Sequence, residues 1–348
     1  MGLREYIIRR LLLVIPIVLG AILLIFAITQ MFSPGQRAML YVRTERDIEH
    51  LDEFIVKYKL NASALDQFTL WLKEIFIHGN FGYSRNPTAG GGPVLAIMLQ
   101  KWPATIELSI FIAPLTILLG IYLGVKSAVH KDKAIDHFTR LLSISGYSLP
   151  SFWLALILIS IVVASTRWVP IGRISTNLMG IVTDTNIFKR YTGFYIIDGL
   201  LNGRPEVTID ALKRIALPVI VVTTINVAGL IRLMRSCMLE ALTKGYIITA
   251  KAKGLKMSEV INKHARRNAL IPVVTVSGMM VAGLMTGLVI TETVFAFDGI
   301  GYWAATSARA LDIPAVVGFT FFTAFLFIFA NLIVDILYAY IDPRIKLG

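Results

Sequence analysis

The chain has 348 residues, of which 56% are hydrophobic and only 16% are charged. Soluble domains carry about 25% charged residues, so this balance excludes an ordinary soluble fold and indicates a protein that crosses a membrane several times. Membrane topology and anionic lipid account for the net charge of +12, so we expect no nucleic-acid partner. The single cysteine, Cys237, excludes an internal disulfide framework.

Six stretches lack Asp, Glu, Lys and Arg and are long enough to cross a hydrocarbon core, which takes ~20 residues or slightly fewer. The expected spans are residues 1–32, 105–126, 140–166, 214–235, 268–291 and 313–338. The sequence therefore predicts an all-α polytopic membrane protein with six transmembrane helices, and the last five of them form one transmembrane domain over residues 103–340.

The basic residues predict the orientation of the spans. If the N-terminus is cytoplasmic, nearly all of the net positive charge falls on short inside loops, as the positive-inside rule requires. The segment 238–267 and the tail 341–348 are then also cytoplasmic, and the chain is a multi-pass protein of the cell (inner) membrane. Three tryptophans fall at the expected outer ends of spans, where an aromatic belt is typical, namely Trp102, Trp168 and Trp303.

Two inserts lie outside the membrane in this orientation. The first, 33–102, follows the first span and contains amphipathic pieces, so we expect an external subdomain of two or three short helices. The second, 167–213, follows the third span, and its loose pattern predicts no particular structure.

The sequence carries no signature of covalent chemistry. It has no glycine-rich phosphate loop, none of its five histidines forms a helical pair with a nearby carboxylate in a span, and no hydroxyl residue of a span has a basic partner nearby. We therefore expect no enzymatic activity, no catalytic residue, no metal site and no cofactor bound by this chain.

An ion-coupled secondary transporter is the main alternative from another class, because such proteins keep ionisable residues near the membrane midplane. The predicted spans carry no charge through their centres. Glu107 and Glu292 lie at outer ends, and Asp335 lies near the inner mouth of the last span, one helical turn after Asn331. Asn331 and Asp335 are candidates for shaping a translocation pathway, although a snorkelling or locally paired helix end is the simpler explanation for Asp335.

A second pair of pathway candidates lies in the third span. Pro150 and Ser151 are part of "GYSLPSFW", residues 146–153. A proline inside a helix frees a backbone carbonyl and can kink the helix. Such kinks are usually packing features, but they also shape paths between helices.

The cytoplasmic segment 238–267 combines positive charge with an apolar stripe. The spacing of Leu239, Leu242, Tyr246 and Ala250 predicts one face of a helix, Gly254 predicts a left-handed stop, and Ser258 can cap a second helix. Such an element either rests on anionic lipid, as in a membrane scaffold, or presents its stripe to a cytoplasmic partner. The glycine turn and the small Ala250 favour a shaped docking surface.

Several motifs then point to a known family. The cytoplasmic segment resembles the corresponding loop of the permease subunits of ABC importers, in the dipeptide and oligopeptide branch, and further motifs match that branch in order over nearly the whole chain. These motifs are "RRLLLVIPIVLGAILLIFAIT" (9–29), "GNFGYS" (79–84), "PATIELSI" (103–110), "SGYSLPSFWLAL" (145–156), "TAKAKGL" (249–255), "HARRNALIPVVT" (264–275), "ETVFAFDGIGYWAATSARALDIPAV" (292–316) and "NLIVDILYAYIDPRI" (331–345). The chain departs from the wider ABC permease signature, because Ile248 stands where that signature has a glutamate six residues before the glycine.

The resemblance implies an ABC type I importer permease fold and a function. The chain would form half of a translocation pathway for peptides, although relatives of this branch carry oligosaccharides or nickel. Its partners would be a second homologous permease subunit, two cytoplasmic ABC ATPases that bind ATP and Mg, an extracellular solute-binding protein and membrane lipid. The residues expected to couple the chain to the ATPases are Leu242, Tyr246, Ala250, Lys253, Gly254 and His264.

Overall fold

The computed structural model describes the backbone of residues 3–85 and 91–341 and most of their side chains. The predicted tail lies outside these residues except for Ile341. The membrane-forming helices are α1 (Leu3–Thr29), α6 (Val94–Val129), α7 (Ala134–Ser148), α8 (Ser151–Thr166), α11 (Pro205–Leu242), α14 (Arg266–Met285) and α17 (Ile313–Ile341). Within the described residues, five helical stretches are long and apolar enough to cross a membrane, or six if the bent pair α7 and α8 counts as one span.

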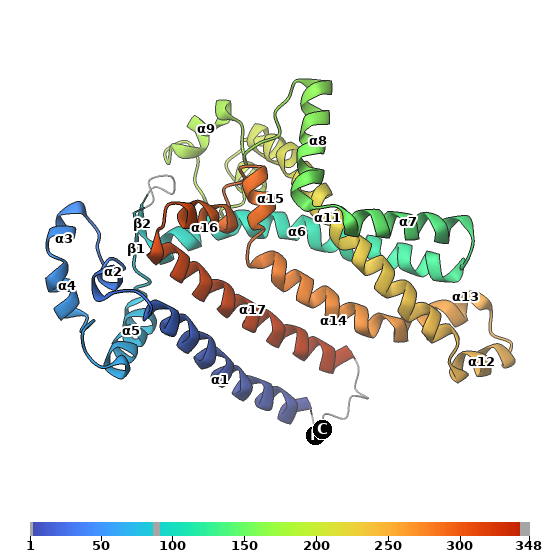
Figure 1. Cartoon of the computed structure of the whole chain (residues 1–348). Coiled ribbons are helices and arrows are strands. Elements are labelled where there is room, and N and C mark those ends of the chain that lie inside the picture. The colour runs from blue at the N-terminus through green and yellow to red at the C-terminus, as the bar shows by residue number, and fades with distance from the viewer. Residues whose placement is uncertain (1–2, 86–90, 342–348) are drawn as a thin grey trace.

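The helices are arranged as a fan in which the N-terminal helix lies at one edge. Figure 1 shows α1 beside α17 and α17 beside α14, in agreement with their contacts. At one end of the fan lie the small helices that follow α1, and at the opposite end lies α12 (Gly245–Ala252). The first insert and the predicted docking segment are therefore at opposite ends of the molecule.

The third predicted span is not a straight helix, which corrects the expectation for residues 140–166. α7 and α8 are bent by 102° at Leu149 and Pro150. Pro150 has no N–H to continue the helix, and its ring pushes the preceding residue out of the helical region. Leu149 accordingly adopts an extended conformation with φ −84° and ψ 127°.

The fifth predicted span is shorter than expected at its outer end. α14 ends at Met285, and the chain turns at Gly287, whose φ of +119° favours glycine. Two short helices follow, α15 (Val289–Val294) and α16 (Ile300–Arg309). Trp303 lies in α16 and is buried among apolar side chains, so its predicted place in an interfacial belt is wrong.

The described part of the first insert has four short helices between residues 33 and 85, rather than two or three. They are α2 (Pro34–Ala38), α3 (Glu45–Glu49), α4 (Leu51–Lys57) and α5 (Ala64–His78), followed by a two-stranded antiparallel sheet of β1 (Tyr83–Ser84) and β2 (Gly92–Pro93). α6 begins at Val94, so the second span starts inside the region predicted as external.

The second insert folds on the beginning of α11. It contains α9 (Thr176–Thr183) and α10 (Tyr195–Leu201), whose buried Val182 and Tyr195 join Phe188 and Val207 in a small apolar cluster. This cluster gives the insert a core of its own, although its sequence pattern predicted no structure.

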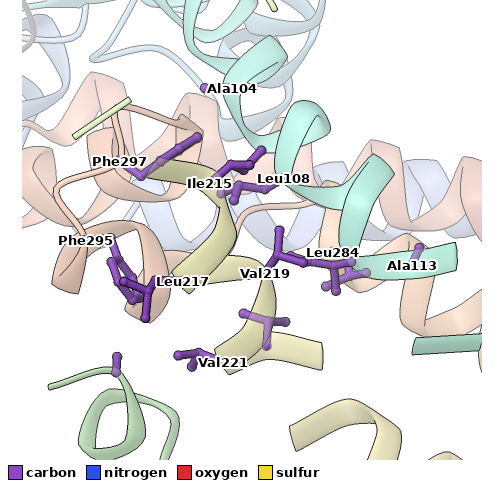
Figure 2. Packing of buried hydrophobic residues seen from close by; sticks show 13 residues of the cluster. Ala104, Leu108, Ala113, Ile215, Leu217, Val219, Val221, Leu284, Phe295 and Phe297 are labelled. Atoms are coloured by element: carbon purple, nitrogen blue, oxygen red, sulfur yellow. The ribbon is translucent and has the colours of Figure 1, made fainter. Parts of the chain in front are cut away.

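The centre of the molecule is the contact between α6 and α11. Gly120 faces Leu230 and Gly124 faces Met234, so the two helices run in the same direction, and a Cβ added at either glycine would lie 2.6 Å from the Cβ of its partner. Towards the outer end, Leu108 and Ile215 meet Leu284 of α14 and Phe295 in the largest buried cluster, which Figure 2 shows from close by.

The glycine contact predicts a direct test of packing. We expect Gly124→Ala to lower the free energy of unfolding by ~1–3 kcal/mol, because the added methyl group would overlap Met234. The control is Gly229→Ala on α11, where a Cβ meets nothing within 4 Å, so stability should stay or rise by up to about 1 kcal/mol through helix propensity. Thermal unfolding of the purified proteins in detergent measures both. Equal melting temperatures for the two variants would contradict the packing argument.

Candidate docking site formed by residues 238 to 267

The docking segment begins with a helix break that the sequence pattern did not predict. α11 is 38 residues long, or ~57 Å, and therefore extends well beyond a hydrocarbon core of ~30 Å. It ends at Leu242, where the Thr243 hydroxyl donates to the carbonyl oxygen of Glu240 at 2.8 Å, a local bond that competes with continued helix. Lys244 is extended, and α12 starts at Gly245. The expected single helix from Leu239 to Ala250 is therefore wrong.

The predicted glycine turn is present after α12. Gly254 has φ +76°, its N–H donates to Lys251 O at 2.9 Å, and the N–H of Leu255 lies 3.4 Å from Ala250 O. These two bonds are the Schellman arrangement that ends a helix through a left-handed residue. A Cβ at Gly254 would meet nothing within 4 Å, so backbone conformation rather than space requires the glycine.

The apolar face of α12 points into the protein. Ile247 is 0% exposed and Ala250 is 6% exposed, whereas Tyr246 and Ile248 are 40% and 66% exposed. The stripe predicted as a docking surface is thus mostly buried, because the helix break rotates α12 relative to α11. Leu242 and Leu239 are also half-buried against this core.

A different set of apolar side chains is available on the surface. Tyr246 and Ile248 on α12 are joined by Leu255 and Met257, which follow the Gly254 turn and are 38% and 51% exposed. Four exposed apolar side chains on one short segment can contact another protein. We call these four residues the apolar docking patch.

The buried side of the segment ties α12 to several membrane-forming helices. Ile247 and Ala250 pack in one cluster with Ala128 of α6, Met234 of α11 and Ala269 of α14. α12 therefore shares a buried core with these three helices, and among the described elements it contacts η2 (Val260–Ala265), which leads into α14, most extensively.

The second helix of the segment is not separate from the membrane domain. α13 (Met257–Glu259) continues through a π-helical stretch, η2 (Val260–Ala265), into α14. Lys256 precedes α13 as its cap and Ser258 lies inside it, so the expected Ser258 cap is wrong. His264 lies half-buried in η2, a kind of helix that often occurs at functional sites.

The exposed charges of the segment are mostly basic. Lys244 pairs with Glu240 and Lys263 with Glu259, each at 2.8 Å. The remaining exposed basic residues form no ion pair with any residue that the structure describes, and these are Lys251, Lys253, Lys256, Arg266 and Arg267. Beside the apolar docking patch they suit an acidic protein surface or anionic lipid.

The four pathway candidates do not come together as one group. Pro150 and Ser151 lie at the bend before α8, which packs on α11 and α15. Asn331 is half-buried on α17, which packs on α14, α1 and α16. Asp335 lies in α17, but its side chain is outside the described residues. Their roles in a pathway stay predictions.

Sequence reasoning missed three buried carboxylates that join separate parts of the chain. Glu107 of α6 pairs with Arg173 of the second insert at 2.7 Å. Glu292 accepts hydrogen bonds from the Thr105 hydroxyl at 2.7 Å and the Tyr302 N–H at 2.8 Å.

The third carboxylate, Asp136 of α7, pairs with Arg235 of α11 at 2.7 Å. In the sequence Asp136 is one of several charges in the loop before the third predicted span, and its partner is separated from it by |i−j| of 99, so no local pattern marks the pair.

The described part of the chain holds no group of three or more His, Cys, Asp or Glu side chains that could bind a metal ion. The expectation that this chain binds no metal or cofactor was made from the sequence and stays a prediction.

Comparison with known proteins identifies close relatives along the whole length. Residues 116–347 match the family model described as "Binding-protein-dependent transport system inner membrane component". The chain is 37% identical to the dipeptide transport system permease protein of Escherichia coli K12, over 98% of each chain. It is 36% identical to the probable D,D-dipeptide transport system permease protein of the same strain, over 95% of this chain and 94% of the relative. It is 35% identical to the oligopeptide transport system permease protein of Bacillus subtilis 168, over 98% and 99%.

The Gly254 turn generates a prediction about local stability. Gly254→Ala should destabilise the end of α12 by ~1 kcal/mol or more, because an L-residue at positive φ is strained. Hydrogen exchange of the backbone amides of residues 250–255 should then quicken by roughly fivefold, as ~1 kcal/mol implies. Gly245→Ala is the matched control, since Gly245 starts the same helix with open space and no positive φ. Equal exchange in the two variants would refute the argument.

Proposed function

The chain belongs to the family of inner membrane components of binding-protein-dependent transport systems, and on that premise we propose that it is the permease subunit of an ATP-driven importer. In this proposal it has the fold of type I ABC importer permeases and forms half of the translocation pathway. The observation that carries the proposal is the family match over residues 116–347, supported by relatives that align with nearly the whole chain.

The proposed cargo is peptides. The three relatives are named for transport of dipeptides, D,D-dipeptides and oligopeptides, and each matches at least 95% of this chain. Oligosaccharides and nickel, which the sequence resemblance left open, are the competing cargoes in the test below.

The proposed partners are a second permease subunit, two cytoplasmic ATPases and an external solute-binding protein. The family description itself specifies dependence on a binding protein. ATP and Mg would be bound by the ATPases, since this sequence has no phosphate-binding loop. Hydrolysis is then a reaction of the partners, and this chain contributes the pathway.

The docking segment is where the ATPases would bind. The apolar docking patch, Tyr246, Ile248, Leu255 and Met257, supplies contact area, and Lys253 adds positive charge beside it. Gly254 shapes the turn between the two halves of the patch.

Three of the residues predicted to couple the chain to the ATPases would act from the buried side of this segment. Ala250 and Leu242 hold α12 on the core, and His264 lies in the adjoining π-helical stretch. Movement of the ATPases would push this segment and switch the helices between outward and inward opening as rigid bodies.

The ion-coupled alternative would need a carboxylate that is free to exchange a cation inside the membrane domain. The side chain of Glu107 is already paired with Arg173, and that of Glu292 is surrounded by hydrogen-bond donors. The contacts of these two buried carboxylates therefore favour a structural role, in which they hold separate parts of the chain together, over a role in ion coupling.

The docking proposal predicts the effect of a charge in the apolar docking patch. Ile248→Asp should reduce the amount of ATPase that co-purifies with the permease by at least about tenfold, because an interface anchor contributes ~2 kcal/mol or more. Ile197→Asp is the control, since Ile197 is also exposed, at 42%, but lies on α10 in the second insert.

Equal retention of the ATPases by both variants would show that the patch is not the docking surface. If the unchanged chain retains no ATPase while residues 238–267 bind anionic vesicles, the segment is a lipid anchor and the permease proposal fails.

Transport in proteoliposomes tests the cargo and the energy source. With all partners present, uptake of a labelled dipeptide should require ATP, persist when ion gradients are collapsed, and be inhibited by excess unlabelled peptide. Inhibition by an oligosaccharide or by nickel ions instead would reassign the cargo. Uptake driven by an ion gradient without ATP would establish the secondary transporter.

A further inference from the structure

The attachment of α7 to α11 depends on a buried ion pair. Arg235 of α11 approaches Asp136 with two nitrogens, and Nε lies 2.7 Å from Oδ1 while Nη2 lies 2.9 Å from Oδ2. The Ser127 hydroxyl donates to Oδ1 at 2.6 Å, and the N–H of Asp132 donates to Oδ2 at 3.0 Å. The side chain of Asp136 is 0% exposed, so both oxygens of a buried carboxylate are satisfied by donors.

Apart from the ion pair, α7 packs on α11 through small residues, and a Cβ added at Gly146 would lie 3.0 Å from Thr224 O and 3.1 Å from the Cβ of Ala228. The buried residues of α7 are small or polar, namely Asp136, Thr139, Ser143 and Gly146. The hydroxyls of Thr139 and Ser143 donate to carbonyls of α7 itself. Four of its large apolar side chains are exposed on the surface of the chain, namely Phe138, Leu141, Ile144 and Tyr147. Small residues therefore bring the two helices close together, and the ion pair adds a charged link with a defined direction between them.

One further charged contact joins the same helices. The guanidinium of Arg232 lies 4.4 Å from the centre of the Tyr147 ring. Tyr147 is 67% exposed, so this contact is weaker than a buried bidentate pair.

The ion pair adjoins the core under the docking segment. Ser127 lies next to Ala128 at the end of α6, and Arg235 lies about two helical turns before the end of α11. Ala128 packs in the same cluster as Ile247 and Ala250 of α12. The pair and the Ser127 hydrogen bond therefore connect α7 to α11 and α6, two of the helices that share this core with α12.

We propose that Asp136 and Arg235 are positioning residues of the transport cycle, which make α7 move with α11 and α12 as one body. This inference rests on the proposed function. When the ATPases displace α12, the pair would carry α7, and with it the α7–α8 bend, along with α11. Without the pair, α11 and α12 would still move with the ATPases while α7 would lag behind, so ATP hydrolysis and transport would become uncoupled.

The test uses the assembled complex in proteoliposomes with Asp136→Asn and Arg235→Lys. Basal ATPase activity should remain, whereas its stimulation by peptide-loaded binding protein, and peptide uptake, should fall by about fivefold or more for Asp136→Asn. Arg235→Lys keeps the charge but loses the bidentate geometry, so its loss should be smaller. If Asp136→Asn fails to assemble because it leaves a buried charge unpaired, Arg235→Lys and the double variant Asp136→Asn/Arg235→Gln provide the comparison.

Asp210→Asn is the matched control. Asp210 pairs with Arg214 at 3.0 Å within α11, so its loss removes an ion pair without touching the α7 attachment. We expect this variant to keep the ratio of stimulated to basal ATPase activity even if its melting temperature falls.

A distance measurement separates coupled motion from simple stabilisation. In a Cys237→Ser background, spin labels at Ile144→Cys on α7 and Ser236→Cys on α11 report the separation of the two helices, since both sites are exposed. The distance should stay the same with and without ATP when the ion pair is intact. It should change or broaden with ATP once Asp136→Asn is added.

Two results would overturn the inference alone. The first is an ion-pair variant whose stimulated ATPase activity and peptide uptake fall only in proportion to its basal ATPase activity. The second is a distance between the α7 and α11 labels that changes with ATP in the protein that keeps Asp136 and Arg235. If the complex with the unchanged chain shows no ATPase stimulation at all, the proposed function fails and this inference falls with it.

Discussion

The close approach of α6 and α11 is the contact on which the rest of the structure depends. Lipid offers no hydrophobic drive for helices to associate, so they must pack through small residues that let the backbones approach. Gly120 and Gly124 provide that approach against Leu230 and Met234. The other parts of the membrane domain are then fastened to this pair, α14 through the shared apolar clusters and α12 through the core that includes Ala128.

Buried carboxylates serve as joints between this central pair and its neighbours. Glu107 holds the second insert through Arg173, Glu292 holds the segment after α14 to Thr105, and Asp136 holds α7 through Arg235. A charge in a low-dielectric interior is costly unless it is fully paired, which is why each of these side chains has several donors. Because their oxygens already have hydrogen-bond or ion-pair partners, these carboxylates are poor sites for exchanging an ion.

In the docking segment the predicted glycine turn is present, whereas the predicted exposed face of the helix before it is mostly buried. The position of the segment on the chain, the glycine turn and the basic charge follow from local sequence, because helix periodicity, a left-handed stop and positive-inside loops are local properties. The face of α12 that is exposed depends on the break at Thr243 and Lys244, which rotates Ala250 inward and leaves Tyr246 and Ile248 outside. Such a rotation depends on how α12 packs in a core that it shares with α6, α11 and α14.

The sequence by itself determined the membrane-spanning class, the approximate positions of the apolar helices, the glycine turn at Gly254 and, through its motifs, the transport family, because each of these depends on local hydrophobicity, charge and short patterns. Only the tertiary structure decided that the third span bends by 102°, that the fifth ends at Met285, and that the first insert holds four helices. It also decided the pairing of Asp136 with Arg235, since a contact between residues separated by |i−j| of 99 depends on how α7 and α11 pack and leaves no local trace.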